Sequence, residues 1–415
     1  MSSPNKGNPY LIIFALWLLV FAASSQVMII SPILPRISEQ LGTPLEILGS
    51  LVTVYAVMVG IFALIMGPLS DKIGRRKILL IGTGGISVFL FLHGLVNTFS
   101  GLLVVRGLAG MAGGVLSGAA VAYVGDYFPY EKRGWANGWV MSGIAMGQIL
   151  GIPIGTLLAD MFGFRIPFVL FGGIMALTFV LVLMKVPQPD VTLTTDRLTV
   201  IGSLRKYHKL LQRSDVRAIA FSYLLMFLSI SIFVVYLPTW LENTFGVSGS
   251  AIASLFFVGG IANVITGPIA GRISDKVGRK KIVITSCIGL SIVLVLTTHV
   301  ITEFWVAYIM FFLAMVLIAM RISPFQALST ELVKSDNRGS LMSLLIAIGQ
   351  VGYGVGGSVA GPFYVQSGYA SNTYIGTMII LILAFIVWKY VPEPELKMDE
   401  TSEQALSPQS SGLAE

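Results

Sequence analysis

The feature that most limits how this chain can fold is a series of apolar runs, each close to the ~20 residues that an α-helix needs to cross a bilayer. Backbone polar groups find no water inside lipid, so a spanning segment must satisfy them internally, as a helix does. The sequence therefore predicts an all-α integral membrane protein with twelve transmembrane helices. We expect these helices near residues 9–34, 45–68, 78–97, 99–125, 134–160, 165–186, 217–240, 248–271, 281–300, 303–328, 339–365 and 371–391.

The composition agrees with burial in a bilayer, because apolar residues make up 55% of the chain and charged residues only 11%. A soluble domain carries about 25% charged residues. The formal net charge is +7, but no basic face carries base-stacking aromatic residues, so nucleic acid is not an expected partner. The expected partners are the lipid bilayer and a small-molecule substrate.

The positions of Lys and Arg predict the orientation of the bundle, since cytoplasmic loops carry an excess of these residues. With both termini in the cytoplasm, all but four of the 27 Lys and Arg residues fall on the inner side. Arg36 and Arg165 fall outside, while Arg106 and Arg321 lie within apolar runs. We therefore predict a protein of the plasma membrane, the inner membrane in a bacterium, with both ends cytoplasmic.

A charged loop between two apolar runs occurs twice, at Gly67–Lys77 and again at Gly271–Lys281, about half the chain apart. A repeat at this spacing predicts two similar halves built around a shared centre. The polar stretch between the halves contains a segment that could form a basic amphipathic helix. The predicted parts are an N-terminal six-helix bundle (1–186), a cytoplasmic linker (187–216), a C-terminal six-helix bundle (217–392) and a disordered tail (393–415).

The first copy of this loop matches the pattern G-x-L-x-D-x-x-G-R-R, and the second copy departs from it at Ile273 and Lys280. The chain thereby resembles the major facilitator superfamily. The resemblance implies two six-helix bundles related by a pseudo-two-fold axis. It also implies an inner latch, a charged cluster that holds the halves together in the outward-facing state and breaks when the inner side opens. The latch residues would be Gly67, Asp71, Gly74, Arg75, Arg76, Asp126, Gly271, Asp275, Gly278 and Arg279.

A glycine-rich segment of the fifth apolar run resembles the antiporter motif G-x-x-x-G-P-x-x-G-G, with Ile152 inserted and Thr156 in place of the last glycine. This form is similar to the sugar-efflux branch of the drug:proton antiporter-1 group, which implies efflux coupled to a proton gradient. A glycine face that packs on a neighbouring helix explains the same pattern without coupling. The matching positions are Gly147, Gly151, Pro153 and Gly155.

Arg106 and Arg321 are the two cations placed within apolar runs, where an unpaired charge is costly unless it pairs or lines a wet cavity. None of the twenty acidic residues falls in the middle of a run, so we predict an electropositive or neutral cavity. Snorkelling of Arg106 and a structural hydrogen bond from Gln26 are the alternatives. The other cavity candidates are Gln26, Tyr236, Gln326, Gln350 and Tyr353.

These features favour a monomeric secondary transporter that works by alternating access. Its expected function is the proton-coupled efflux of small neutral, amphipathic or anionic organic molecules. A uniporter, or an organic-anion exchanger or uptake carrier without proton coupling, is the alternative. A membrane sensor without transport is disfavoured, because the linker and tail are short. The three histidines are scattered and no H-E-x-x-H, G-x-S-x-G or phosphate-loop lysine is present, which argues against an enzyme, a metal site or a cofactor.

Overall fold

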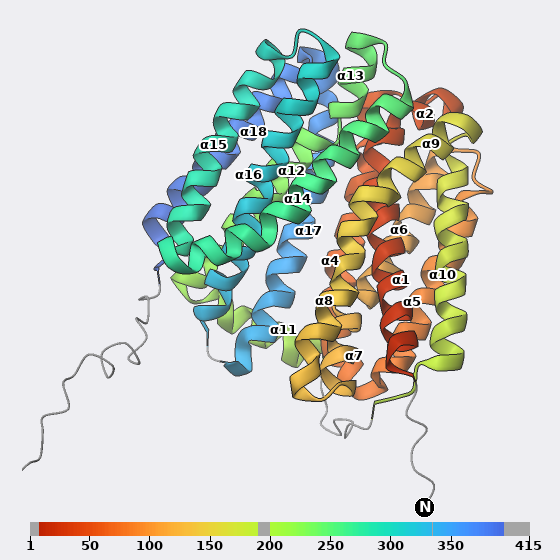
Figure 1. The fold of residues 1–415 in the computed structure, drawn as a ribbon, viewed down its shortest axis with the longest axis vertical. Helices are drawn as coiled ribbons and strands as arrows, with labels where there is room; N and C mark the ends of the chain where they lie inside the picture. The colour runs from red at the N-terminus through yellow and green to blue at the C-terminus, as the bar shows by residue number, and fades with distance from the viewer. Residues whose placement is uncertain (1–7, 190–199, 334, 394–415) are drawn as a thin grey trace, which may run out of the picture.

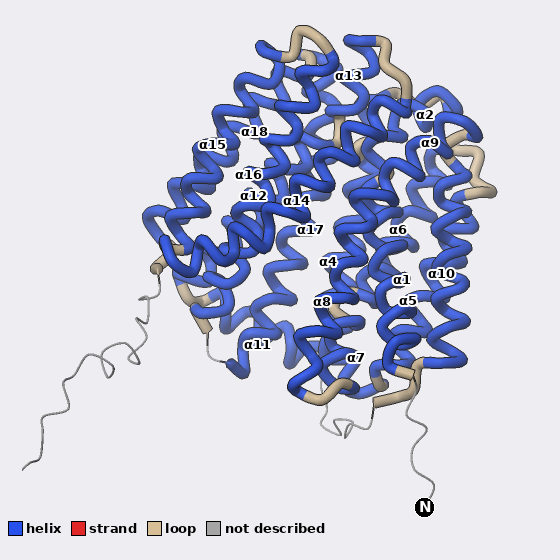
Figure 2. The backbone as a smooth tube through the Cα atoms, in the orientation of Figure 1, coloured by secondary structure: helices blue, strands red, loops and turns tan. Residues whose placement is uncertain are grey.

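The computed structural model describes residues 8–189, 200–333 and 335–393, and within these ranges every regular element is a helix (Figure 2). In the described part of the chain, twelve helical segments are long and apolar enough to cross a membrane, as the sequence predicted. The predicted disorder of the tail falls outside the described residues, except for residue 393. We call the end of the bundle that carries the repeated loops the inner end, and the opposite end the outer end.

The N-terminal half contains six spans, four of which consist of more than one helical piece. The pieces are α1 (Pro9–Met28), α2 (Ile30–Leu41), α3 (Leu45–Leu48), α4 (Ser50–Ile73), α5 (Arg75–His93), α6 (Phe99–Leu116), α7 (Ala119–Tyr127), α8 (Tyr130–Met146), the π-helix η1 (Gly147–Gly151), α9 (Ile152–Phe162) and α10 (Arg165–Lys185).

The C-terminal half repeats this plan after a linker helix. The linker helix is α11 (Val200–Leu211), and the half itself consists of α12 (Ser214–Val234), α13 (Leu237–Phe245), α14 (Gly249–Val277), α15 (Arg279–Val300), α16 (Phe304–Glu331), α17 (Ser335–Ser367) and α18 (Tyr369–Tyr390).

The first span bends near its outer end, as its prolines predict. Helix α1 ends at Met28, and α2 begins at Ile30. Pro32 lacks the N–H that would bond the carbonyl of Met28, so the helix loses a hydrogen bond where it breaks. Pro35 lies inside α2. The bend therefore follows from the position of Pro32.

Four further interruptions were not predicted. The second span breaks at Gly49, between α3 and α4. The fourth span breaks at Gly118, whose φ of 74° lies in the left-handed region that favours glycine. The fifth span contains η1, which ends two residues before Pro153, a residue that lacks a donor for the regular ladder. The seventh span breaks at Tyr236, just before Pro238. These interruptions place side chains such as that of Tyr236 at the junctions between helices.

Each repeated loop is a single-residue turn at the inner end. Gly74 separates α4 from α5 with a φ of 101°, and Gly278 separates α14 from α15 with a φ of 105°. Only glycine adopts this conformation without strain. The repeat therefore makes the same abrupt reversal of the chain in both halves.

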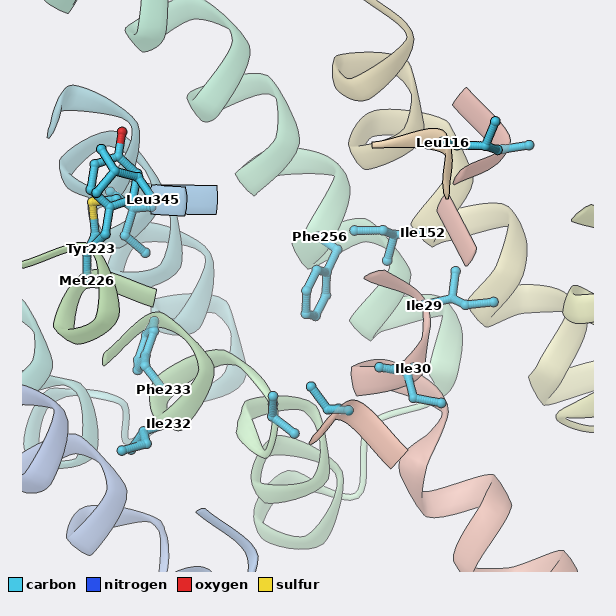
Figure 3. Packing of buried hydrophobic residues seen from close by; sticks show 14 of the residues in the cluster. Ile29, Ile30, Leu116, Ile152, Tyr223, Met226, Ile232, Phe233, Phe256 and Leu345 are labelled. Carbon is cyan, nitrogen blue, oxygen red and sulfur yellow. The ribbon is translucent and has the colours of Figure 1, made fainter. Parts of the chain in front are cut away.

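The two halves lie side by side, with α2, α9 and α13 at one end of the molecule and α7, α8 and α11 at the other (Figure 1). Helix α17 of the C-terminal half packs along α4, and α14 packs along α9 and η1. All of these contacts join one half to the other. Figure 3 shows Phe256 of α14 beside Ile152 of α9, near Ile29 and Ile30 at the bend of the first span. The apolar core is therefore continuous from one half to the other.

Candidate functional site

Arg106 occupies a fully buried position on α6, where 1% of its surface is exposed. Its Nη1 donates to the side-chain oxygen Oε1 of Gln26 at 2.9 Å, and Nη1 and Nη2 each donate to the backbone oxygen of Gln26 at 3.4 Å. Gln26 in turn donates from Nε2 to the Tyr55 hydroxyl at 2.7 Å. Helices α1, α4 and α6 thus meet at one polar group inside the N-terminal half.

Two aromatic rings also lie against the Arg106 guanidinium. Its central carbon lies 4.4 Å from the centre of the Tyr55 ring and 5.7 Å from that of Phe168. Cation–π contacts of this kind are worth more where water is excluded. Arg106 is therefore held inward by its neighbours, not snorkelling toward the outer surface.

No carboxylate balances this charge within the described part of the chain, whose buried polar and charged residues include no Asp or Glu. Neutral oxygens and aromatic faces partly replace the lost hydration, but Arg106 Nε has no hydrogen-bond partner in the described residues. Such a group attracts anions and the oxygens of neutral ligands. We name Arg106, Gln26 and Tyr55 the guanidinium site.

Two predicted residues of the opposite half, Tyr353 and Gln350, lie on α17 and turn toward the N-terminal half. Tyr353 is half-buried and is an electrostatic neighbour of Arg106. The Cβ of Gln350 would lie 3.6 Å from a methyl group placed at Gly60 of α4. The guanidinium site therefore lies at the face where α4 and α17 of the two halves pack together.

Arg321 is not part of this site. It lies on α16 with no exposed surface, next to the Cys287 thiol of α15. All three of its side-chain nitrogens lack a hydrogen-bond acceptor in the described residues. The structure thus places the second arginine inside the C-terminal half, away from the Gln26 and Tyr55 side chains that hold Arg106.

Two other cavity candidates also lie elsewhere. Gln326 is exposed on α16. Tyr236 is fully buried near the outer end, where its hydroxyl accepts from the Gly49 N–H at 3.0 Å and donates to the Leu45 oxygen at 2.7 Å. Tyr236 thereby joins α13 to the start of the second span in the opposite half.

Further hydrogen bonds join the two halves toward the outer end. The Ser31 hydroxyl of α2 lies 2.8 Å from the backbone oxygens of both Val234 and Val235. Thr53 of α4 donates to the Gly354 oxygen of α17 at 2.5 Å. Together with Tyr236, these contacts form what we call the outer junction.

At the inner end, the first repeated loop makes its described contacts within its own half. Arg75 Nε donates to Asp126 Oδ2 at 2.6 Å, which joins α5 to α7. Arg76 donates to the Leu183 oxygen of α10 at 2.6 Å. Gly67 and Asp71 lie on α4, but the structure does not describe the Asp71 side chain. Because Arg75 and Asp126 belong to the same half, parting the halves does not by itself separate them.

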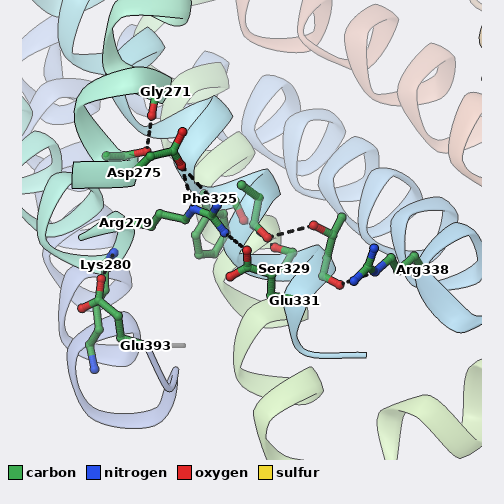
Figure 4. A network of polar contacts seen from close by, with 12 residues as sticks. Gly271, Asp275, Arg279, Lys280, Phe325, Ser329, Glu331, Arg338 and Glu393 are labelled. Carbon is green, nitrogen blue, oxygen red and sulfur yellow. Dashed lines mark hydrogen bonds and ion pairs between the residues drawn. The ribbon is translucent and has the colours of Figure 1, made fainter. Parts of the chain in front are cut away.

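The second copy is built in the same way (Figure 4). Arg279 of α15 bonds Asp275 of α14 at 3.1 Å and also pairs with Glu331 of α16. Lys280 donates to the Val391 oxygen at 2.9 Å. Gly271 sits one turn before this cluster on α14, where Ser274 donates to its oxygen at 2.7 Å. Each repeated loop therefore ties three helices of its own half together.

The antiporter-like glycines face α1. A methyl group at Gly147 or Gly151 would collide with the hydroxyl groups of Ser24 and Ser25, and one at Gly155 would lie 2.6 Å from Ile29. Pro153 is the second residue of α9. This segment therefore brings the fifth span into close backbone contact with the first, which is the packing alternative expected from the sequence.

Sequence reasoning missed Tyr55 and Phe168. Both lie in apolar runs, where an aromatic residue at helical spacing looks like any other core residue. Their contact with Arg106 depends on how α4 and α10 pack, and no local signal in the sequence carries that information.

Comparison with known proteins identifies the fold and its relatives. The Major Facilitator Superfamily profile matches residues 16–216 and 219–413. The multidrug resistance protein MdtG of Proteus mirabilis (strain HI4320) is 25% identical over 335 residues, which cover 80% of this chain and 82% of that protein. The MFS-type transporter YwfA of Bacillus subtilis (strain 168) is 25% identical over 406 residues, 96% of each chain.

Among solved structures, the crystal structure of a D-xylose-proton symporter superimposes with a TM-score of 0.77 at 19% sequence identity. The match covers 94% of this chain and 99% of the symporter. At this identity the likeness concerns the fold, which is the arrangement of two six-helix bundles.

Proposed function

The chain belongs to the major facilitator superfamily of membrane transporters, which are not enzymes, and on that premise we propose that it exports small neutral, amphipathic or anionic organic molecules by alternating access. The proposal includes coupling to a proton gradient across a bacterial inner membrane, with both termini in the cytoplasm and the monomer as the working unit. The multidrug resistance name of its MdtG relatives supports efflux.

The observation that carries this proposal is the guanidinium site. Arg106 is buried, lies where the halves pack together, and is held by Gln26 and Tyr55 without a carboxylate. A transporter of organic cations would expose its substrate to this uncompensated charge, which costs energy in a low-dielectric site. A carboxylate, phosphate or carbonyl oxygen on the substrate would instead gain a charge-assisted hydrogen bond.

The outer junction supports an inward-facing arrangement of the halves in this structure. Contacts at Tyr236, Ser31 and Thr53 tie the halves together toward the outer end. Alternating access requires these contacts to break when the outer side opens. Gln350 and Tyr353 would then change their distance from α4 during the cycle, which suits residues that meet a substrate.

The test begins with a thermal-shift screen of the purified protein against organic anions, neutral sugars and cationic drugs. A hit is then followed as flux into proteoliposomes with Arg106→Lys, Arg106→Gln and Arg321→Gln variants. We expect Arg106→Gln to reduce flux at least tenfold, about 1.4 kcal/mol of lost interaction. Arg106→Lys should retain part of the flux, because the charge remains. Unchanged flux in Arg106→Gln would exclude the guanidinium site as the substrate site.

Exchange or uniport without a proton is the second candidate, and the same absence of Asp and Glu among the buried described residues favours it. A carrier without an acid near its substrate has no obvious group there to release a proton in exchange. Flux measured with and without an imposed pH gradient separates the two. Gradient-driven flux supports proton coupling, whereas flux that depends only on substrate on the opposite side supports exchange.

A further inference from the structure

Four charged residues meet near the outer end, where the N-terminal half faces α13. Arg36 of α2 donates to Asp160 Oδ1 of α9 from Nη2 at 2.5 Å and from Nε at 3.0 Å. Its Nη1 lies 3.7 Å from the carboxylate of Glu242 on α13 and 3.9 Å from that of Glu39. We name these residues the outer cluster. Of its three carboxylates, only Glu242 belongs to the C-terminal half.

Asp160 makes a second contact across the same boundary. Its carboxyl carbon would lie 2.8 Å from a methyl group placed at Gly249, the first residue of α14. The first turn of a helix carries free N–H groups and a partial positive charge, which favours a nearby carboxylate. The outer cluster therefore spans the boundary between the halves, with Arg36 beside Glu242 and Asp160 at the start of α14.

The cluster contains more negative than positive charge. Arg36 faces three carboxylates and bonds Asp160 most closely. Burial by itself would lower the pKa of Arg36, but the hydrogen bond with Asp160 and the charges of Glu242, Asp160 and Glu39 outweigh it and raise that pKa, so Arg36 stays cationic. Closing the junction brings Glu242, with 11% of its side chain exposed, next to two like charges that share one cation.

The other helices around α13 add no further basic side chain to Glu242. Helices α12 and α14 carry their charged residues near their inner ends. On α17, Tyr364 accepts from Asn243 at 3.0 Å, and on α18, Tyr369 stacks on Trp240 with ring centres 4.8 Å apart. Glu46 on α3 lies near Tyr236, and its charge is also negative. Arg36 is therefore the one guanidinium that Glu242 meets in the described residues.

We propose that the outer cluster is a proton-binding gate, in which Glu242 takes up a proton from the outer side as the outer junction closes. The inference rests on the alternating access of the proposed function. In the open state Glu242 lies in water and is ionised. In the closed state a proton on Glu242 removes the repulsion by Asp160 and Glu39, while Arg36 keeps its bonds to Asp160.

The pH dependence follows from counting protons. The closed state binds one proton more than the open state, so acidification on the outer side favours closure and alkalinisation favours opening. One proton changes the ratio of closed to open molecules by at most about tenfold per pH unit.

The experiment measures this ratio directly. Cys287, the only cysteine, is replaced by Ala, and spin labels are attached to Met161→Cys on α9 and Thr244→Cys on α13, which are both exposed. Double electron–electron resonance in lipid nanodiscs then gives the distance distribution from about pH 8 to about pH 5, a range that includes shifted carboxylates. Glu242→Gln is the test variant. Glu303→Gln is the matched control, because Glu303 is an exposed acid at the start of α16.

The proposal expects the closed population to rise on acidification in the parent protein and in Glu303→Gln. Glu242→Gln should stay mainly closed. Its ratio of closed to open molecules should change by less than about twofold per pH unit, whereas one proton allows a change of up to about tenfold. A parent protein without pH response, or an equally steep response in Glu242→Gln, would overturn it. The distance measurement needs no substrate, so the two proposals can fail separately. Flux without any pH-dependent change in the label distance would refute the proton gate but not the transport function. A pH-dependent change in the label distance without flux of any ligand would refute the transport function but not the gate.

Discussion

The outer junction and the inner repeated loops hold the molecule together in different ways. At the outer junction, polar groups of one half bond the other, as Tyr236 does with Gly49 and Leu45. At the repeated loops, the described ion pairs stay within a half, as Arg75 does with Asp126. A change at the outer junction should therefore alter how the halves meet, whereas a change in the loops should alter the stability of one half.

This difference also bears on the inner latch implied by the family resemblance. The described latch pairs are formed here while the outer junction is closed. Since Asp126 and Glu331 each pair with an arginine of their own half, these pairs can persist through the transport cycle. Any contact that the loops make across the inner end would then have to come in addition to these pairs.

The largest effect is expected at the closest approach of α4 and α17. A methyl group at Gly357 would lie 2.9 Å from both the Gly49 oxygen and the Val52 Cβ. Gly357→Val should weaken the closed outer junction by about 3 kcal/mol or more, because the backbone of the facing helix must move. The distance between the two spin labels should lengthen at every pH.

The control is Gly173→Val on α10, where a methyl group would meet nothing within 4 Å. It should leave the label distance unchanged. Equal lengthening in both variants would mean that the effect comes from valine in a transmembrane helix and not from the contact between halves.

Removing the Tyr236 hydroxyl is the next test. In Tyr236→Phe, the buried Gly49 N–H and Leu45 oxygen lose their partner, at a cost of roughly 1–3 kcal/mol. The open population at the outer end should rise in the distance measurement. Tyr374→Phe, which loses one exposed hydrogen bond with His299, is the matched control and should not change it. A similar rise in Tyr374→Phe would refute the assignment of Tyr236 to the junction.

Breaking the Arg75–Asp126 pair should instead act within one half. Asp126→Asn should lower the free energy of unfolding by about 1 kcal/mol, since 26% of the Asp126 side chain is exposed and solvent screens the pair. We expect a lower melting temperature of the purified protein with an unchanged distance between the outer labels. The exposed Glu131→Gln is the control. A shift of the label distance in Asp126→Asn alone would show that this pair does couple the halves.

Much of the fold follows from the sequence because its signals are local. Apolar runs of spanning length predict the twelve helices, and the recurring glycines, Gly74 and Gly278, predict where two pairs of helices reverse direction. The break at Gly118 could not be predicted in the same way. Its neighbourhood contains several glycines and other small residues, and nothing in the local sequence marks which of these glycines adopts a positive φ.

The candidate site was predictable only in part. Arg106 stands out because a cation in an apolar run needs an explanation, and Gln26 because it is a polar group near the middle of a span. The outer cluster gave no such signal. Arg36 and Asp160 lie 124 residues apart, and each reads as an ordinary charge near a helix end. Their meeting with Glu242 depends on the docking of the two halves, which the sequence pattern does not specify.

The smallest effect is expected in the second repeated loop. Asp275 is the counterpart of Asp71, and 62% of its side chain is exposed, so water and salt screen its pair with Arg279. Arg279 also keeps Glu331 as a partner. Asp275→Asn should therefore change the free energy of unfolding by less than about 0.5 kcal/mol, as for other exposed pairs one helical turn apart. The contrary outcome would be a melting temperature lowered as much as in Asp126→Asn. The second loop would then depend on Asp275 as strongly as the first depends on Asp126. Solvent exposure would not explain a difference between the two copies.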